Sequence, residues 1–375
     1  MSNQLLVNLP ILFEKPTGIA TYAANLFPHL KPLNPTLLIS SIAAQHFPLA
    51  AEFTSYPIPG DLTPAQGTKG HFRRLVWTQF KVQKIYQNLK SSLLFSPIPE
   101  APIYTNCRYV VTVHDLIPLR FPRNFSPLIP YFRYYIPQVL SQSQHIICDS
   151  QATANDIIDF YNIPASKITP ILLGYNTNHF REKVVRTGKK CQWLEERKFP
   201  YFLYVGRHDP YKNIHRLIDA FAGISNCHDY ELLIAGSSDP RYTPILQTKV
   251  DELGLSDRIK FMDYITYGEL PIIINGAIAL VFPSLWEGFG LPVLEAMACG
   301  TPVITSNLSS LPEVTGDAAI LINPYNTGEI TAAMEAIARD NNLRSHLSTL
   351  SIARASQFSW EKTGKATSEI LAKYI

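Results

Sequence analysis

The stretch AIALVFPSLWEGFGLPVLEAMACGTPVIT, residues 277–305, decides the fold class of this chain. It begins with the apolar run AIALVF and ends with TPVIT, and both runs are typical of buried β-strands. Between them, LPVLEAMACG is typical of a helix, with Pro292 near its first position and Gly300 just past its end. Strand, helix and strand in this order indicate parallel strands joined by a crossover helix.

The same alternation continues along the rest of the chain. Amphipathic stretches at 19–30, 213–224, 244–254 and 268–277 separate short aliphatic or β-branched runs. This pattern predicts an α/β protein in which helices cover both faces of parallel sheets, the doubly wound arrangement. The candidate strands are QLLVNL 4–9, TLLISS 36–41, YVVTVH 109–114, HIICDS 145–150, ITPILL 168–173, YFLYVG 201–206, YELLIAG 230–236, RIKFM 258–262, AIALVF 277–282, TPVIT 301–305 and AAILI 318–322.

The series of strands restarts in the middle of the chain. Residues 174–200 carry dense charge and no strand pattern, so a linker is expected there. The sequence therefore predicts two Rossmann-like domains that face each other, residues 1–175 and residues 176–359. Ligands of such sheets bind beyond the carboxyl ends of the strands, so the site is expected in a central cleft between the domains.

Composition is that of a globular protein with enough chain for two cores. Of 375 residues, 46% are hydrophobic and 17% charged. The five cysteines are scattered without a C-x-x-C pair, which favours a reducing cytosol over a disulfide framework or zinc knuckle. The N-terminus lacks a basic region before its apolar run, and the run 270–285 is too broken to span a bilayer. A cytoplasmic protein is expected.

Positive charge is concentrated in the first half of the chain. Residues 69–133 hold ten basic residues, among them Arg73, Arg74, Arg120 and Arg123, against two acidic ones. This stretch is either an ordinary solvated face or a surface for an anionic acceptor or for lipid headgroups on the inner membrane face. The aromatic run YFRYYIP beside it fits a membrane interface or a buried core equally well.

The turn EGFG, residues 287–290, joins the strand at 277–282 to the helix at 291–300. Its two glycines, Gly288 and Gly290, allow the backbone to approach a ligand closely. The free N–H groups of Phe289, Gly290 and Leu291 are expected to favour a phosphate or sugar oxygen at the helix N-terminus. Glu287 and Glu295 flank this turn and would reach opposite ends of an extended ligand, such as a nucleotide sugar.

The motifs resemble those of the retaining glycosyltransferases of family 4, which have the GT-B fold. The resemblance rests on the stretch 284–324 and on FLYVGRHDPYKNIHRLIDAF, residues 202–221. VTVHDLIPLRFP, ICDSQATANDI and FSWEKTGKAT match in the family's usual order, so the resemblance covers nearly the whole chain. It implies transfer of a hexose, with retention, from a nucleotide-diphosphate sugar, and the absence of a D-x-D motif predicts that the transfer is metal-independent. GDP-mannose and UDP-glucose are the favoured donors, and no cofactor is implied.

The resemblance also implies roles for single residues. Arg207 and Lys212 correspond to the pair that clamps the donor diphosphate, and two cations there would stabilise the charge of the departing phosphate. Glu295 corresponds to the residue that holds the ribose hydroxyls, and Glu287 to the one that contacts the transferred sugar. His114 corresponds to a residue of the first domain near that sugar.

Gly18 opens the first helix and would present backbone N–H groups to the donor. Two positions depart from the family pattern, Thr17 and Asp263, where glycine is usual. These departures affect the expected shapes of two loops more than they affect the assignment to the family. The resemblance further implies that a helix at about 360–375 crosses back to the first domain.

Other chemistries find little support in the sequence. There is no D-x-D metal handle, no P-loop, no nucleophile elbow and no H-E-x-x-H motif. A glycosidase needs two carboxyl groups that flank the bond to be cleaved, roughly 5 to 9 Å apart. Glu287 and Glu295 are instead expected to reach different ends of the donor. A sugar-nucleotide epimerase on the same fold and a non-catalytic nucleotide-sugar-binding subunit remain as alternatives. The expected acceptor is a glycan, a lipid-linked sugar or a small molecule of polysaccharide biosynthesis, and no nucleic-acid partner is expected.

Overall fold

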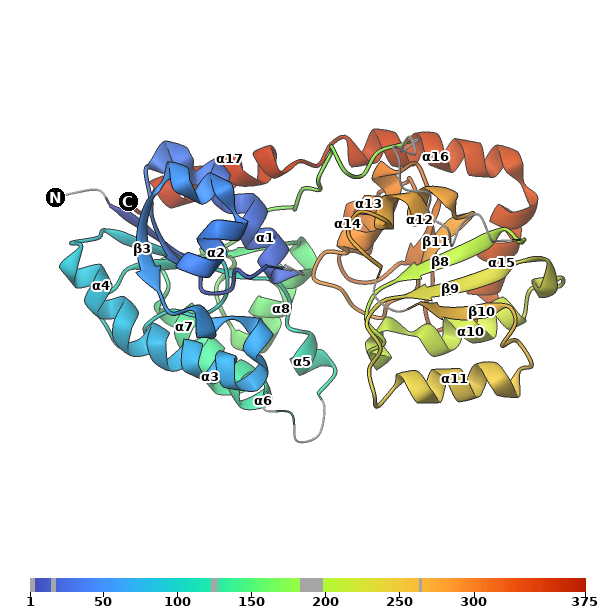
Figure 1. Ribbon diagram of the computed structural model, residues 1–375, viewed down its shortest axis with the longest axis horizontal. Helices are drawn as coiled ribbons and strands as arrows, with labels where there is room; N and C mark the ends of the chain where they lie inside the picture. The colour runs from blue at the N-terminus through green and yellow to red at the C-terminus, as the bar shows by residue number, and fades with distance from the viewer. Residues whose placement is uncertain (1–3, 15–17, 123–125, 127, 183–197, 263–264) are drawn as a thin grey trace. The chain divides into compact units, whose positions relative to one another are not determined.

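The computed structural model describes residues 4–14, 18–122, 126, 128–182, 198–262 and 265–375. The chain divides into two compact units, shown in Figure 1. Unit 1 is Met1–Gly174 together with Trp360–Ile375, and unit 2 is Tyr175–Ser359. Each unit contains one parallel sheet covered by helices, so the predicted α/β class is confirmed.

Unit 1 holds a seven-stranded sheet in the order β3-β2-β1-β4-β5-β6-β7, and every neighbouring pair is parallel. The central strands are buried along their whole length, because helices cover both faces and leave no polar side to alternate with. The strands are β1 (Leu5–Asn8), β2 (Thr36–Ser40), β3 (Thr54–Ile58), β4 (Leu93–Ser96), β5 (Tyr109–Val113), β6 (His145–Cys148) and β7 (Ile168–Pro170).

Two helices of unit 1 begin at serine caps where the chain leaves the sheet. The Ser40 hydroxyl accepts from Ala43 N at 3.1 Å, and the Ser150 hydroxyl accepts from Thr153 N at 3.1 Å. The helices are α1 (Ile19–Leu26), α2 (Ser41–His46), α3 (Gly67–Trp77), α4 (Gln83–Asn88), α5 (Ile117–Arg120), α6 (Leu128–Pro130), α7 (Ile136–Gln142), α8 (Gln151–Tyr161) and α17 (Trp360–Ala372), with π-helical turns η5 (Thr78–Val82) and η6 (Tyr131–Tyr135).

Helix α17 belongs to unit 1, although the whole of unit 2 precedes it in the sequence. It packs against α1 and against the 3₁₀ helix η1 (Phe27–Leu33). The Thr363 hydroxyl donates to Leu172 O at 2.8 Å, and a Cβ on Gly364 would lie 2.2 Å from the Cβ of His29. This contact therefore requires a glycine at position 364.

Unit 2 holds a six-stranded sheet in the order β10-β9-β8-β11-β12-β13, again parallel throughout. The order reverses between β8 and β11, which start the two halves of the sheet. The strands are β8 (Tyr201–Val205), β9 (Glu231–Ala235), β10 (Ile259–Met262), β11 (Ala279–Phe282), β12 (Val303–Ser306) and β13 (Ile320–Ile322).

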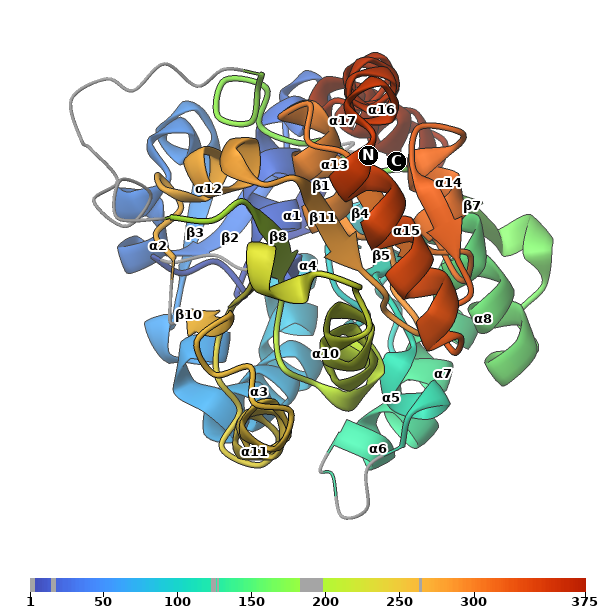
Figure 2. The same cartoon turned by 90° about the vertical axis from the view of Figure 1, so that its right-hand side faces the viewer.

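Helices lie on both faces of the unit 2 sheet, as Figures 1 and 2 show. On one face α10 packs against α11 and α15, and on the other α13 packs against α12, α14 and α16. Helix α13 connects β11 to β12, so the crossover predicted for residues 277–305 is present. The helices are α10 (Ile214–Ala222), α11 (Thr243–Glu252), α12 (Leu270–Gly276), α13 (Leu291–Ala298), α14 (Leu311–Thr315), α15 (Thr327–Arg339) and α16 (Asn341–Ala355).

Each strand expected from the sequence is present, and β3 and β4 occur in addition. The helix expected over 19–30 ends at Leu26 and continues as η1, because Pro28 cannot donate to an α-helical hydrogen bond. Most of the expected linker, 183–197, and the departures at Thr17 and Asp263 lie outside the described residues. No helix in the described part of the chain is both long and apolar enough to cross a membrane.

The basic stretch 69–133 is partly neutralised inside unit 1. Arg74 is only 6% exposed, and its Nε and Nη2 donate to the two carboxylate oxygens of Glu100, each at 2.8 Å. Arg120 donates through Nε to both oxygens of Asp156, at 2.9 and 3.1 Å. Glu100 therefore already pairs with the charge of Arg74, which leaves this residue poorly suited to bind an external anion.

The aromatic run 131–137 contributes mainly to the core. Tyr131 and Tyr135 stack on each other and pack against the buried cluster of unit 1, while Tyr134 is 66% exposed. The buried-core alternative holds for most of this run.

Candidate active site

Of the nine described residues with a buried side-chain polar atom that has no partner, five lie at the carboxyl ends of strands. In unit 1 they belong to Asn8 at the end of β1, Ser96 at the end of β4 and Asp149 directly after β6. In unit 2 they belong to His208 and Ser284, which follow β8 and β11. Because such atoms are normally hydrogen-bonded, each of these two edges offers groups that a polar ligand or water can satisfy.

A buried ion pair lies at this edge of unit 2. Lys212 ends the 3₁₀ helix η8 (Pro210–Lys212) after β8, and Glu287 lies in the turn after β11, the neighbouring strand. Lys212 Nζ donates to Glu287 Oε1 at 2.6 Å, with the side chains only 12% and 10% exposed. The structure thus brings together two predicted site residues that lie far apart in the sequence.

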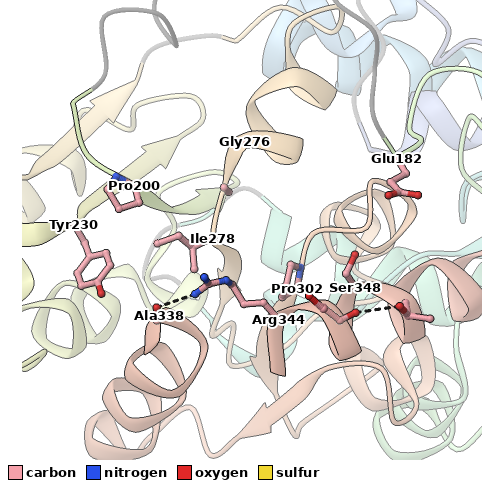
Figure 3. A pocket seen from close by; sticks show the side chains of 12 residues that line it. Glu182, Pro200, Tyr230, Gly276, Ile278, Pro302, Ala338, Arg344 and Ser348 are labelled. Carbon is pink, nitrogen blue, oxygen red and sulfur yellow. Dashed lines mark hydrogen bonds between the residues drawn. The ribbon is translucent and has the colours of Figure 1, made fainter. Parts of the chain in front are cut away.

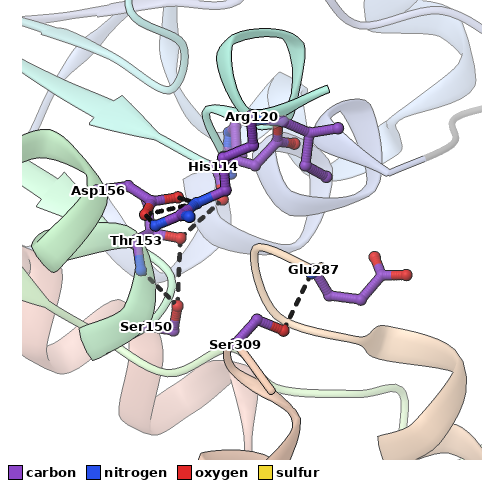
Figure 4. Close-up of polar contacts among 9 residues, drawn as sticks. His114, Arg120, Ser150, Thr153, Asp156, Glu287 and Ser309 are labelled. Carbon is purple, nitrogen blue, oxygen red and sulfur yellow. Dashed lines mark hydrogen bonds and ion pairs between the residues drawn. The ribbon is translucent and has the colours of Figure 1, made fainter. Parts of the chain in front are cut away.

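Serines from the loop after β12 hold the turn 287–290 in place. Glu287 N donates to the Ser309 hydroxyl at 3.1 Å, a contact drawn in Figure 4. The Ser310 hydroxyl lies 3.0 Å from Glu287 O and 2.8 Å from Phe289 O, and its one proton can be donated to either carbonyl oxygen. These bonds use the carbonyl groups on the inner side of the turn.

The same turn leaves three backbone donors unused. The N–H groups of Phe289, Gly290 and Leu291 have no hydrogen-bond partner among the described residues, and they lie at the N-terminus of α13. Gly290 has φ 103° and ψ 50°, a conformation that favours glycine. The N-terminus of α13 therefore presents unused backbone donors, and their binding of a donor oxygen stays a prediction.

Gly290→Ala is expected to destabilise unit 2. Its Cβ would lie 2.8 Å from Leu311 Cδ2, and φ is positive, so strain and crowding add to roughly 2 kcal/mol. Denaturant unfolding measures this loss. Gly268→Ala is the matched control, because a Cβ at Gly268 meets no atom within 4 Å. Equal stability of the two variants would contradict the tight packing of this turn.

Arg207 differs from Lys212 in being exposed. It follows β8 directly, its side chain is 69% exposed, and its Nε lies 3.3 Å from the buried Asp209 carboxylate. Such a surface pair contributes little to stability, so the guanidinium can turn towards an anion at small cost. The structure places Arg207 and Lys212 in the same loop but in different environments.

Glu295 lies one turn inside α13, and its carboxyl group accepts no hydrogen bond from the described residues. Burial raises the pKa of its carboxyl group from 4.5 to about 8. Tyr267 and Cys299 lie close enough that a charge on Glu295 raises the pKa of each. At neutral pH the carboxyl group of the free protein is therefore mostly protonated.

His114 follows β5 in unit 1, and both of its ring nitrogens are engaged. Nδ1 lies 2.7 Å from Asp149 Oδ2, and Nε2 donates to Pro97 O at 2.8 Å. Burial lowers the pKa of His114, but the Asp149 carboxylate and the Pro97 carbonyl outweigh it, so the pKa is raised. Thr153 Oγ1 lies between His114 O and the Ser150 hydroxyl, as Figure 4 shows. The imidazole ring of His114 is therefore held in place by its two hydrogen bonds and is not free to donate a proton to a ligand.

Gly18 caps the N-terminus of α1 in unit 1. It has φ 49° and ψ −109°, and a Cβ there would meet no atom within 4 Å. Glycine is required by its backbone conformation and not by crowding. The expected approach of a donor to this backbone stays a prediction.

Sequence reasoning missed several supporting residues. Asp149 stands directly after the strand at 145–148, and this strand pairs with the strand that His114 follows. A carboxylate at this strand end was therefore a signal that could have indicated a partner for His114. Ser309 and Ser310 carry no such signal, because only the folded chain brings them to the turn at 287–290. Tyr267 likewise approaches Glu295 only through the fold.

A cavity of about 660 Å³ in unit 2 lies away from these residues. Figure 3 shows Pro200, Ile278 and Pro302 on its wall, and these precede β8, β11 and β12. It therefore opens at the amino ends of the strands, opposite the edge that holds Lys212 and Glu287. In the described part of the chain, no three His, Cys, Asp or Glu side chains are grouped to hold a metal ion.

The fold defines the class of protein. The structure of Anabaena HepE in complex with UDP-glucose superposes with a TM-score of 0.76 at 18% identity, covering 99% of both chains. WaaG, a glycosyltransferase of lipopolysaccharide biosynthesis, superposes with a TM-score of 0.72 at 14% identity, covering 98% of this chain and 99% of WaaG. The architecture is therefore the GT-B fold, as predicted.

The sequence relatives then identify the family. The profile of the glycosyl transferases group 1 matches residues 186–352, and that of glycosyltransferase family 4 matches residues 16–179. The O-antigen chain mannosyltransferase RfbU of Salmonella typhimurium is 28% identical over 90% of this chain and 94% of its own length. The O-antigen chain mannosyltransferase B of Escherichia coli is 30% identical over 68% of this chain and 67% of its own length.

The chain belongs to glycosyltransferase family 4 and is a glycosyltransferase. The predicted family and enzyme class are confirmed. The activity named for both relatives, mannosyl transfer, is a hexosyl transfer of the kind predicted.

Proposed function

We propose that the protein transfers a hexose, with mannose favoured, from a nucleotide-diphosphate sugar to a hydroxyl group, with retention of configuration. The acceptor is a glycan, a lipid-linked sugar or a small molecule of polysaccharide biosynthesis. The buried Lys212–Glu287 pair beside the free N–H groups of α13 carries this proposal. It combines a cation and an anion-binding helix terminus with a carboxylate, as a charged sugar donor requires.

The donor lies along unit 2 with its diphosphate at Arg207 and Lys212. Lys212 has three N–H donors and Glu287 uses one, so two remain for phosphate oxygens. Glu287 contacts hydroxyls of the transferred sugar, and Glu295 holds the ribose. The backbone of Gly288, Phe289, Gly290 and Leu291 meets donor oxygens at the start of α13.

Catalysis in this proposal is electrostatic. Negative charge grows on the donor phosphate as the sugar leaves, and Arg207, Lys212 and the N-terminus of α13 stabilise it. The acceptor proton passes to a donor phosphate oxygen in a front-side displacement. Since both nitrogens of His114 are bonded, the side chain acts by shaping the sugar's surroundings, and Gly18 offers its backbone to the donor.

GDP-mannose is the favoured donor, because the relatives reported above are named mannosyltransferases, and UDP-glucose comes second. A thermal-shift panel of sugar nucleotides tests this choice. A donor at a hundred times its dissociation constant adds about 2.7 kcal/mol of stability. GDP-mannose is expected to raise Tm most, and a panel in which no sugar nucleotide raises Tm would contradict the proposed function.

Activity is expected to survive EDTA, because the sequence has no D-x-D motif to hold a metal–diphosphate complex. Turnover of GDP-mannose with and without the chelator measures this, with a metal-dependent transferase as the positive control for chelation. A loss that Mn²⁺ or Mg²⁺ restores would refute metal independence.

The epimerase and the non-catalytic binding subunit gain no support from the relatives, which are named transferases. Slow donor hydrolysis without acceptor would exclude a binding subunit, and release of a C2-epimerised sugar would instead indicate an epimerase.

Unit 1 is proposed to bind the acceptor and unit 2 the donor. The protein acts in the cytoplasm and contacts the inner membrane face through the basic N-terminal unit. A membrane contact would bring the enzyme to a lipid-linked acceptor.

A further inference from the structure

One long helical segment of unit 1 exposes an apolar stripe. The segment α3–η5–α4 runs without a break from Gly67 to Asn88, and Figure 1 shows α3 and α4 as a continuous light-blue rod. Its inner side is buried at Gly70, Arg74, Thr78, Val82 and Ile85. Its outer side exposes three apolar residues spaced four apart, which are Phe72 (67% exposed), Val76 (43%) and Phe80 (62%).

Exposed cations lie along the same helical segment. Residues 67–88 contain no Asp or Glu, and Lys69, Arg73, Lys81 and Lys84 are all exposed. Arg73 pairs with Asp61 at 2.9 Å, whereas the three lysines have no ion-pair partner among the described residues. We call the three apolar residues with these four cations the Phe72–Phe80 face.

We propose that the Phe72–Phe80 face docks on an anionic phospholipid surface. Its two phenylalanine rings enter the boundary between headgroups and acyl chains, and the cations lie among the phosphates. This rests on the membrane contact proposed above and assigns it to one helix face, in place of Arg74 and Arg120, whose charges are used inside unit 1.

The charge pattern favours a lipid surface over a second copy of the chain. A two-fold symmetric contact through this face would bring Lys69, Lys81 and Lys84 against the same cations of the partner. An anionic bilayer offers opposite charge across the whole face and accepts the apolar stripe at the same time.

Vesicle co-sedimentation tests the proposal. The wild-type protein is expected to bind vesicles of phosphatidylglycerol and phosphatidylcholine at low salt and to bind pure phosphatidylcholine far less. Phe72→Ser/Phe80→Ser is expected to weaken binding at least about tenfold, because two exposed rings no longer enter the bilayer. Ile42→Ser/Leu49→Ser is the matched control, since Ile42 (61% exposed) and Leu49 (50%) lie elsewhere on unit 1.

A second variant tests the contribution of the lysine charges to vesicle binding. Lys69→Gln/Lys81→Gln/Lys84→Gln is expected to weaken binding on the order of a hundredfold and to reduce its dependence on salt. Unchanged binding in either Phe72–Phe80 face variant, or equal loss in the Ile42/Leu49 control, would overturn the assignment. A wild-type dimer that becomes a monomer in Phe72→Ser/Phe80→Ser, without vesicle binding, would assign the face to a second copy instead.

Donor binding keeps this test separate from the proposed function. The Tm shift with GDP-mannose should be the same in the wild type and in both face variants, because no residue of this face belongs to the donor site. Lost vesicle binding with an intact Tm shift therefore concerns the face alone. A wild type that binds donor and ignores both kinds of vesicle would refute the docking proposal and leave the transferase assignment standing.

Discussion

Lys212→Ala is expected to lower kcat on the order of a hundredfold and to destabilise the protein by about 3 kcal/mol. The first effect follows from removing a cation from a phosphate whose charge grows as the sugar leaves. The second follows from the 2.6 Å contact with Glu287, which would leave a carboxylate 10% exposed without its partner. Steady-state kinetics and denaturant unfolding measure the two effects independently.

Two further variants separate these effects. Arg207→Ala should lose a comparable amount of kcat with almost no change in stability, because its side chain is 69% exposed. Lys212→Ala/Glu287→Gln should regain most of the lost stability without regaining activity, since no buried charge is then left unpaired. The kinetic losses at Arg207 and Lys212 should not add, because both act on one diphosphate.

Near-normal turnover of both single variants, in folded protein, would place the diphosphate elsewhere. The role given to the turn at 287–290 would fall with it.

Donor affinity is expected to rise with pH, and Glu295 is the reason. Burial raises the pKa of its carboxyl group to about 8, so the free protein holds a neutral acid below that pH. Ribose hydroxyls donate to a carboxylate, so binding requires the proton to leave. The Kd for donor should fall roughly tenfold between pH 6.5 and pH 8 and then level off.

Glu295→Gln removes the titration and keeps the shape of the side chain. Its donor affinity should not change over this pH range, and isothermal titration calorimetry compares the two proteins. The same slope in the variant would assign the effect to another group. A wild type without slope would mean that the neutral acid binds ribose.

The same group affects the stability of the free protein. Because the folded-state pKa is raised above the usual 4.5, its contribution is present in full below pH 4.5 and is lost as pH rises towards 8. Above pH 8, Glu295→Gln should therefore have a higher free energy of unfolding than the wild type, by up to about 5 kcal/mol, the energy of a pKa shift from 4.5 to about 8. Glu295→Ala, which loses the ribose contact in ground and transition states alike, should raise KM more than it lowers kcat.

The sheets were predictable where strands are apolar throughout, because two covered faces leave a strong local signal. β3 was missed because it is exposed at four of its five positions and contains Pro57, which fits only an edge strand. β4 was missed because LLFS is only four residues long and favours no one structure by itself. Both segments form strands because they pair with a neighbouring strand in the folded sheet, and the local sequence alone does not indicate this.

The candidate site was predictable as a set of residues but not as a set of contacts. The motifs place Lys212 and Glu287 on loops after different strands, and only the adjacency of β8 and β11 brings them within 2.6 Å. The partners of His114 come from two other segments, at Pro97 and Asp149. The hydrogen bonds of its ring could not be seen in the sequence, where only the family resemblance placed His114 near the transferred sugar.

The return of α17 to unit 1 has a consequence for synthesis on the ribosome. Unit 2 is one uninterrupted stretch, Tyr175–Ser359, whereas unit 1 needs Trp360–Ile375 to cover α1 and η1. Domains usually fold in the order in which they are made. Here the first-made unit is completed last, and its nascent form must wait, with the surface around His29 and Tyr22 uncovered, until some two hundred later residues have been translated.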